Sequence, residues 1–219
     1  MPDNRYPSAV LSQQKDMDLL DTVDEILAFL IEMKLHSRPE VSALAELLED
    51  SGSAYCVSDA QDGLEVRVSP EVRESVRRAV SEAEAKPTAG SAAEHLATAW
   101  QTVYGLHPDP VRAYSEAIKA VECAAHAIVQ PTNTKATLGS MLGEIRNARH
   151  RFTAAISTPS GDPIAPAEAM MRALWEGQTS RHGAQSGTVP ETLEAARAGV
   201  HLAATLVQWF TSGAVVRTR

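Results

Sequence analysis

The chain has only two cysteines in 219 residues, Cys56 and Cys123, and they lie far apart. No CxxC pair is present, so neither a disulfide framework nor a cysteine-based zinc site is expected. We expect two free thiols in a reducing compartment. Aromatic residues are also few, at 5%. A composition rich in alanine and poor in aromatics favours closely packed helices over sheets.

Long hydrophobic runs and an excess of basic residues are missing too. No apolar run approaches the roughly 20 residues that cross a bilayer, and the first 14 residues are polar. We therefore expect no membrane segment, no signal peptide and a cytoplasmic location. Metal-ligand spacings such as HExxH are absent, so no metal and no other cofactor is expected. The net charge is −8. Nucleic-acid-binding proteins usually show a basic domain or stripe, so any contact with RNA must be local.

Helical periodicity begins near residue 16. Apolar residues recur every three to four positions over residues 16–30 and 39–49, which predicts two helices. Residues 53–69 alternate apolar and charged side chains around Asp62-Gly63, which predicts one small β-hairpin and no larger sheet. A charged helix follows from Pro70 to about residue 85. The segment 86–91 interrupts it, so we divide the chain into an N-terminal helical segment, 1–90, and a helical bundle, 91–219.

The rest of the chain predicts a mostly α, up-and-down helical bundle. Asp109 is the expected N-cap before Pro110. The pattern Thr188-x-x-Glu191 resembles a capping box that starts the last helix. Apolar residues cover a wide arc of that helix, which predicts either a central helix or one that also contacts a second subunit. The expected helices cover residues 91–104, 110–129, 137–150, 166–175 and 188–210.

The polar stretch between the last two predicted helices has the residue types most suited to catalysis. It contains Arg181 and His182, bounded by Gly177 and Gly183. Arginine binds phosphate through paired hydrogen bonds, and histidine transfers protons near neutral pH. Together they suit phosphodiester cleavage, in which a 2′-hydroxyl loses its proton and a charged phosphorane is stabilised. The alternative is that both are loop residues whose polar groups are satisfied by the helix ends.

Four segments of the C-terminal half carry a resemblance by pattern and order. They are residues 109–122 (DPxxAYxxAIKAVE), 135–139 (KATLG), 181–183 (RHG) and 201–210 (HLAxxLVxWF). In these segments the chain resembles the abortive-infection branch of the HEPN superfamily, small helical bundles of prokaryotic defence systems and toxins. The resemblance implies a metal-independent endoribonuclease in phage defence or a toxin system. It also implies RNA as substrate, a homodimer whose two motifs form the site, and an antitoxin or other protein partner.

The family motif is an arginine, four to six residues and then a histidine at the start of the last long helix. His182 falls at the position of that histidine, while the arginine positions correspond to Trp175, Glu176 or Gly177. The nearest arginines are Arg181 and Arg172. The resemblance therefore assigns His182 and Arg181 as catalytic, with Arg172 in support. The alternative is a catalytically inactive HEPN-like module that binds a protein partner or a nucleotide.

A second polar set lies on the helix expected after Asp109. Glu116, Lys119, Glu122 and His126 recur at steps of three and four, which places them on roughly one face. In a functional interpretation, Glu122 or Glu116 orients the catalytic histidine. In a structural one, this face is solvated and carries an intrahelical Glu116–Lys119 ion pair.

The densest basic cluster consists of Arg146, Arg149 and Arg151. It suits an RNA phosphate in an otherwise acidic chain. Alternatively, it is a basic helix C-terminus that complements the helix dipole. Trp175, near a polar helix end, either stacks on a base or anchors the core.

Overall fold

The computed structural model describes residues 14–34, 39–156, 161–181 and 187–218. Within these ranges the chain forms eight α-helices and two antiparallel two-stranded sheets. It divides into two compact units at Val68–Ser69, and Tyr104–His107 belongs to the first. We call them the N-terminal unit and the C-terminal unit. The sequence had placed the boundary at residues 90/91. The helix before that point packs on the last helix, which joins it to the C-terminal unit.

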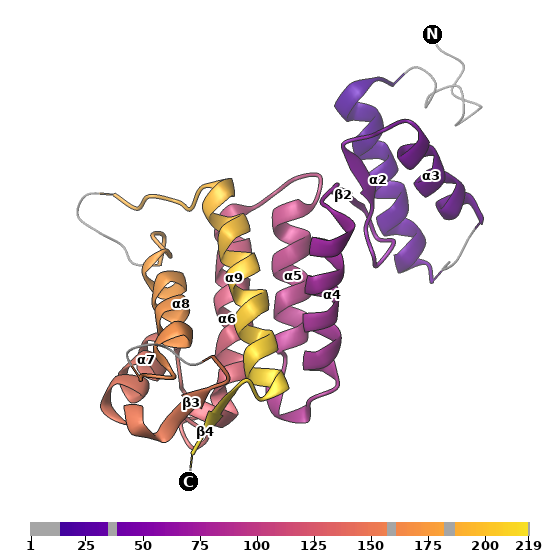
Figure 1. The fold of residues 1–219 in the computed structure, drawn as a ribbon. Coiled ribbons are helices and arrows are strands. Elements are labelled where there is room, and N and C mark those ends of the chain that lie inside the picture. The colour runs from indigo at the N-terminus through magenta and orange to yellow at the C-terminus, as the bar shows by residue number, and fades with distance from the viewer. Residues whose placement is uncertain (1–13, 35–38, 157–160, 182–186, 219) are drawn as a thin grey trace. The chain divides into compact units, whose positions relative to one another are not determined.

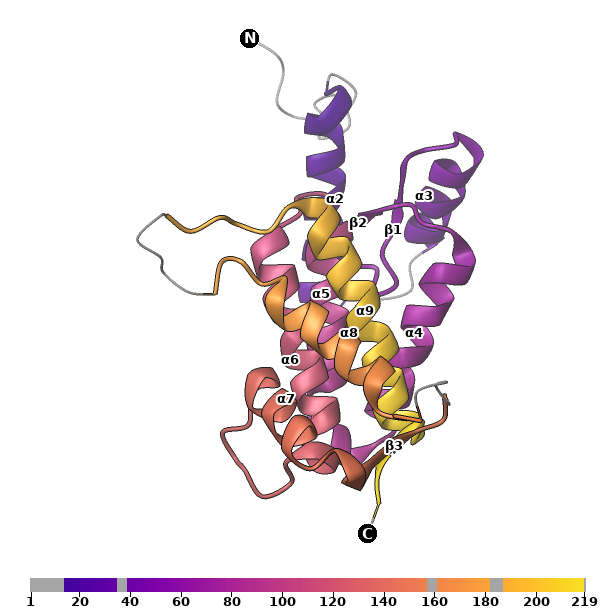
Figure 2. The same ribbon diagram turned by 60° about the vertical axis from the view of Figure 1, so that its left-hand side comes forward.

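The C-terminal unit is a helical bundle built around its last helix. Helix α9 packs along α6 and also contacts α4 and α8, while α7 contacts both α6 and α8. Figures 1 and 2 show α9 beside α6, with α4 and α5 on one side and α7 and α8 on the other. The helices are α4 (Pro70–Glu84), α5 (Ala92–Tyr104), α6 (Pro110–Val129), α7 (Leu138–Asn147), α8 (Ala165–Glu176) and α9 (Leu193–Ser212), with short 3₁₀ turns η1 (Pro87–Ala89) and η2 (Arg149–Arg151).

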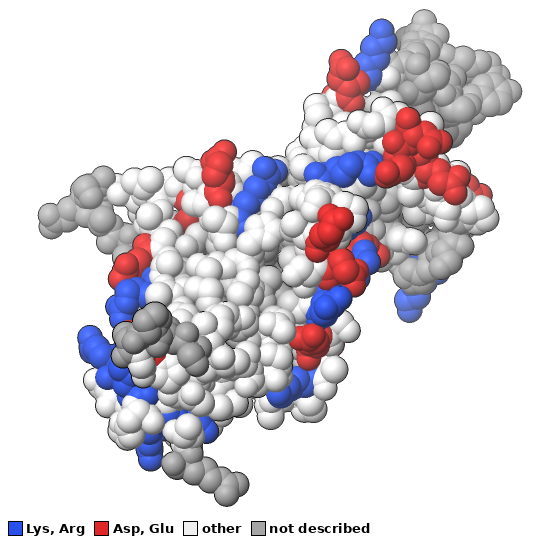
Figure 3. All heavy atoms as spheres, viewed as in Figure 1, with Lys and Arg blue, Asp and Glu red and all other residues white. Residues whose placement is uncertain are grey.

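The wide apolar arc of α9 is explained by its central position. Its contacts with three helices bury residues on several sides, among them Val200, Val207 and Phe210. Its outward surface is nearly free of charge, and Figure 3 shows a broad area without Lys, Arg, Asp or Glu over this helix. Of the two alternatives from the sequence, the central helix is therefore the one observed, and the homodimer stays a prediction.

Helix starts follow local capping chemistry, with one correction. The Asp109 side chain accepts a hydrogen bond from the backbone N–H of Arg112 at 3.0 Å, which confirms the predicted N-cap. The last helix begins at Leu193, five residues later than predicted. Its N-cap is Thr192, and the capping box predicted from Thr188 and Glu191 is wrong. The reason is that the Glu191 carboxylate accepts hydrogen bonds from another segment of the chain, residue Ser180.

The second sheet was not predicted. Strand β3 (Phe152–Ala154) pairs antiparallel with β4 (Val215–Arg217), with Phe152 opposite Arg217. Each strand has three residues, too few for an alternation pattern to stand out, and the partners are far apart in the sequence. The expectation of a single two-stranded sheet is thus wrong in number, although neither sheet in the described ranges exceeds two strands.

The N-terminal unit consists of two helices and the predicted hairpin. Helices α2 (Asp16–Glu32) and α3 (Pro39–Asp50) precede strands β1 (Tyr55–Val57) and β2 (Leu64–Val66), which pair antiparallel. The hairpin is confirmed within residues 53–69. The small core centres on buried Leu27, Val41, Val57 and Leu64, one from each helix and strand.

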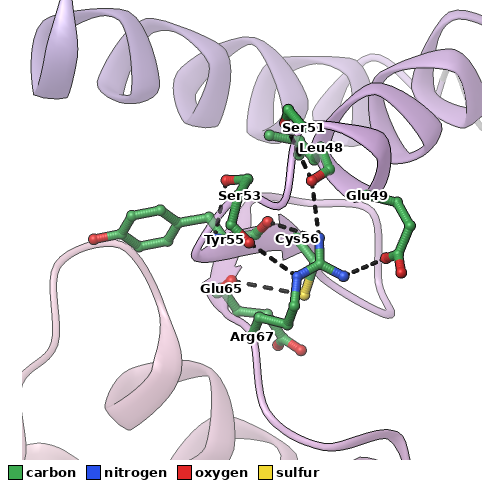
Figure 4. Close-up of polar contacts among 8 residues, drawn as sticks. All are labelled: Leu48, Glu49, Ser51, Ser53, Tyr55, Cys56, Glu65 and Arg67. Atoms are coloured by element: carbon green, nitrogen blue, oxygen red, sulfur yellow. Dashed lines mark hydrogen bonds and ion pairs between the residues drawn. The ribbon is translucent and has the colours of Figure 1, made fainter.

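Arg67 fastens the hairpin to the end of α3 (Figure 4). Its guanidinium donates to the carbonyl oxygens of Leu48 and Tyr55, each at 3.2 Å, and its Nε donates to that of Ser53 at 3.0 Å. It also pairs with the carboxylate of Glu49. The last carbonyl groups of a helix have no intrahelical partner, so a cation placed there stabilises the helix end.

Candidate functional site

The connection between α8 and α9 is closed at its base by side-chain hydrogen bonds. Thr179 Oγ1 donates to the carbonyl oxygen of Val189 at 2.7 Å. Ser180 donates to Glu191 Oε1 twice, from its backbone N–H and from its hydroxyl, both at 2.9 Å. Glu191 is only 6% exposed, and both of these bonds are partly buried. The backbone directly before Arg181 is therefore held in place by these hydrogen bonds.

Arg181 is held against the end of α8. Its guanidinium carbon lies 3.2 Å from the centroid of the Trp175 ring, and its Nη1 donates to the Trp175 carbonyl oxygen at 3.0 Å. Such a cation over an indole face is attracted by the negative charge of the ring face. His182 and Gly183 lie outside the described residues. The structure thus places the predicted phosphate-binding residue, Arg181, at the loop base.

Tyr114 joins three helices next to this base. Its ring and hydroxyl pack against Gly177, at the end of α8, and against Gly199 of α9. A Cβ at Gly199 would lie 2.8 Å from Tyr114 Cε2, so the close approach requires glycine. Burial, together with the negative charge of Glu191, raises the pKa of Tyr114 above its usual range. The side chain is therefore a neutral phenol that ties α6 to the loop base.

Glu191 is a buried carboxylate that can accept a further hydrogen bond. One oxygen accepts both bonds from Ser180, while the other is buried and has no hydrogen-bond partner in the described part of the chain. Buried carboxylate oxygens are normally paired. Glu191 was not identified from the sequence as a site residue because its spacing from Thr188 suggested a capping box. Its hydrogen bonds to Ser180 join two ends of the connection, and no sequence pattern near Glu191 indicates such a contact.

Glu122 caps a neighbouring helix. Its Oε1 accepts a hydrogen bond at 2.6 Å from the backbone N–H of Leu138, the first residue of α7. Burial raises the pKa of Glu122, although that bond and the positive charges of Lys119, Arg181 and His95 oppose the rise. The Glu122 carboxylate therefore lies within electrostatic range of Arg181. Its hydrogen bond, however, is to the first backbone N–H of α7 and stabilises that helix.

Glu116 uses both oxygens in polar contacts with neighbouring side chains. His95 Nδ1 lies 2.7 Å from Oε2, and Lys119 Nζ donates to Oε1 at 2.7 Å. Burial alone would raise the pKa of Glu116, but the hydrogen bonds from Lys119 and His95 outweigh it and hold the pKa below its ordinary value. The intrahelical Glu116–Lys119 pair expected in the structural interpretation is confirmed. The carboxylate bonded to the loop base is Glu191.

The predicted basic residues are partly neutralised by carboxylates. Arg149 pairs with Asp162 and Glu168, and Arg172 pairs with Glu168 at 2.7 Å. Glu168 is buried and bridges the two arginines. These pairs fasten α8 to the η2 turn. Figure 3 shows basic side chains gathered over α7 and the β3–β4 sheet, but the ion pairs reduce the net charge of this region.

A small pocket brings two of these arginines to Trp175. It has a volume of about 180 Å³ and lies between α7 and α8, lined by Arg146, Arg172 and Trp175 together with Gly139. The Trp175 indole packs directly on Gly139, where a Cβ would lie 2.8 Å from Cη2. Arg146 is exposed and Arg151 is an exposed residue of η2 that does not line this pocket. The structure therefore joins Arg146, Arg172 and Trp175, with Arg181 stacked on the same indole.

A larger groove lies elsewhere in the C-terminal unit. It has a volume of about 680 Å³ and runs between α4 and α9, with His201 and Thr205 among its lining residues. His201 makes an edge contact with the Trp100 ring, 5.8 Å between centroids, and burial lowers its pKa. Arg181, the predicted catalytic residue that the structure describes, does not line this groove, so the α8–α9 connection remains the candidate site.

Neither cysteine forms a disulfide in the described part of the chain. No three His, Cys, Asp or Glu side chains of residues 14–34, 39–156, 161–181 and 187–218 come together as metal ligands do. In the same ranges, no helix has the length and apolar character needed to cross a bilayer. Comparison with protein-family models, with curated proteins and with solved structures returned no match.

Proposed function

We propose that the C-terminal unit is a HEPN-like bundle of the abortive-infection type and that its α8–α9 connection is a metal-independent endoribonuclease site. His182 is the proton-transferring group and Arg181 the phosphate-binding group. The observation that carries the proposal is the closed loop base, in which Thr179 and Ser180 are bonded to the other end of the connection. Catalytic groups need such fixed supports, because small misplacements cost large factors in rate.

In the proposed reaction, the imidazole of His182 removes the proton of an RNA 2′-hydroxyl. The 2′-oxygen then forms a bond to the adjacent phosphorus, and the bond from phosphorus to the 5′-oxygen of the next nucleotide breaks. That 5′-oxygen takes up a proton from water, and the imidazolium gives its proton to the hydroxide so formed. The products carry a 2′,3′-cyclic phosphate and a 5′-hydroxyl. The guanidinium of Arg181 stabilises the negative charge that builds up on the phosphorane.

Neighbouring residues have supporting roles in this proposal. Arg146 and Arg172 line one pocket with Trp175, and we assign them contacts to a flanking phosphate. Arg149 and Arg151 extend the basic region along η2. Glu122 and Glu116 act only indirectly in this proposal. Glu122 holds a helix end near Arg181 in place, and Glu116 holds the charged group of Lys119.

The assembly is part of the proposal. Family members pair their motifs across two subunits, and a second copy of this chain would supply a second α8–α9 connection. The uncharged surface over α9 in Figure 3 supports such a contact, since interface centres are depleted of charge. Light scattering at tens of micromolar should give the mass of a dimer, and a monomer would contradict this part. A protein partner such as an antitoxin, in phage defence or a toxin system, belongs to the same proposal.

One observation favours a second candidate, a catalytically inactive HEPN-like module that binds a protein partner or a nucleotide. The Arg181 guanidinium is stacked on Trp175 and bonded to its carbonyl oxygen. These contacts have to be exchanged or shared before Arg181 takes a phosphate. If they persist, the same loop serves as a contact surface only.

Cleavage of labelled RNA by the full chain, with EDTA present, tests the proposal. His182→Ala should lower the rate by about 10²–10⁴-fold while the far-UV circular dichroism stays unchanged. His107→Ala is the matched control, because that imidazole is 70% exposed and belongs to the N-terminal unit. Failure of the parent to cut RNA, or equal rates for parent and His182→Ala, would leave the binding module as the function.

A further inference from the structure

The negative charge of the protein is concentrated in the N-terminal unit. Residues 14–68 contain thirteen Asp and Glu against four Lys and Arg, whereas residues 69–219 contain fourteen against fifteen. Figure 3 shows acidic side chains gathered over this unit around α3. A phosphate backbone is repelled by such a surface. The N-terminal unit is therefore suited to contacts with proteins and not with RNA.

Helix α2 has two apolar faces, and only one of them enters the core. The core face packs through Leu27, with Leu20, Val23 and Leu30 partly buried beside it. The second face, which we call the outer stripe, is exposed. It consists of Leu19, Ile26, Phe29 and Met33, with exposures of 36%, 43%, 56% and 55%.

The outer stripe has the spacing of a helix–helix seam. Leu19, Ile26 and Met33 follow one another at intervals of seven residues, and Phe29 lies between the last two. This interval keeps apolar side chains along one line of a helix, as in coiled coils. Single exposed apolar residues are ordinary, but three large ones along one line of a helix, continued by its C-cap residue Met33, mark an interaction surface.

Acidic residues border the outer stripe along its length. Asp18, Glu25 and Glu32 also repeat every seven residues, and at 100° per residue they lie next to Phe29, on the side away from the core. All three are exposed, and none pairs with a basic side chain in the part of the chain that the structure describes. Residues that border a helix seam select the partner through opposite charges.

We infer that the outer stripe of α2 is a docking surface for an amphipathic helix of a partner protein, with an apolar seam bordered by Lys and Arg. Apolar contact supplies the affinity and the charged border supplies the selectivity. A second copy of α2 is a poor occupant, because the acidic borders formed by Asp18, Glu25 and Glu32 would add to each other's negative charge. The inference concerns the N-terminal unit and does not depend on the proposed nuclease activity.

The test uses the full chain and two synthetic helical peptides of about three heptads, with Leu along the seam. One peptide has Lys at the border positions and the other has Glu. Fluorescence anisotropy should show binding of the Lys peptide, weakened by added salt because the border charges are exposed. The Glu peptide should not bind. Absence of binding by the Lys peptide would overturn the inference.

Variants locate the binding surface. Ile26→Ser with Phe29→Ser should weaken binding of the Lys peptide by about tenfold or more, whereas Val72→Ser, a 38% exposed apolar residue of α4, should not. Glu25→Lys with Glu32→Lys should reverse the preference and select the Glu peptide. Unchanged binding in both double variants would overturn the inference. The inference would also be overturned if sedimentation showed a dimer of the parent that the Ile26→Ser, Phe29→Ser variant does not form. A second copy of the chain would then be the occupant.

Discussion

Replacing Gly199 by alanine perturbs the contact that ties α6 to α9 beside the candidate site. The new Cβ would lie 2.8 Å from Cε2 and 3.1 Å from Cδ2 of Tyr114. Carbon atoms normally approach to about 3.5–4.0 Å. Tyr114 has little freedom to withdraw, because its hydroxyl packs against Gly177 on the other side and the residue is only 4% exposed.

The expected effect is the balance of two opposing contributions. Alanine in place of a helical glycine stabilises by about 1 kcal/mol when space is free. Overpacking of a filled site costs about 1–3 kcal/mol. We therefore expect Gly199→Ala to lower the free energy of unfolding by up to about 2 kcal/mol. Gly143→Ala in α7 is the matched control, since a Cβ there meets nothing within 4 Å. It should raise the free energy of unfolding by up to about 1 kcal/mol.

Tryptophan fluorescence during urea unfolding is the appropriate assay. All three tryptophans, Trp100, Trp175 and Trp209, belong to the C-terminal unit, so the signal reports that unit alone. Combining Gly199→Ala with Tyr114→Leu should remove most of the penalty, because the clashing ring is then absent. Equal stability of Gly199→Ala and Gly143→Ala would refute the packing described for Tyr114.

Three further predictions concern other contacts. Arg67→Ala should destabilise the N-terminal unit by about 1–3 kcal/mol, seen as faster hydrogen exchange in α3 and the hairpin; unchanged exchange would contradict the role of Arg67. Glu116→Gln should make stability less dependent on pH below neutrality. The lowered pKa of Glu116 adds stability that is present above the pKa of an unfolded glutamate and is lost as pH falls through the folded value; an unchanged acid limb in pH-dependent unfolding would contradict this. Glu191→Ala should speed tryptic cleavage after Arg181, because Ser180 loses both of its hydrogen bonds to Glu191. Glu194 is exposed, and Glu194→Ala as the control should leave the cleavage rate unchanged.

The helices could be predicted because their signals are local. Apolar periodicity and helix-boundary residues located the eight helices of the described ranges, and Asp109 with Pro110 fixed the start of α6 to the residue. The Glu116–Lys119 pair was also predictable, since residues three apart on a helix are neighbours.

What could not be predicted depends on contacts between distant segments. The β3–β4 pairing joins residues 152–154 to 215–217, and nothing within either segment indicates the other. The predicted start of α9 was too early because Thr188 and Glu191 have the spacing of a capping box, whereas Glu191 is in fact bonded to Ser180. The stacking of Arg181 on Trp175 likewise depends on where α8 ends, and sequence spacing does not report it.

The chemical ends of the RNA fragments test the central claim most directly. The full chain is incubated with RNA in the presence of EDTA, and the product termini are identified by mass spectrometry. The proposed reaction predicts 2′,3′-cyclic phosphate and 5′-hydroxyl termini that disappear in His182→Ala. Fragments with 5′-phosphate and 3′-hydroxyl ends that form only with added metal, or no cleavage at all, would contradict it.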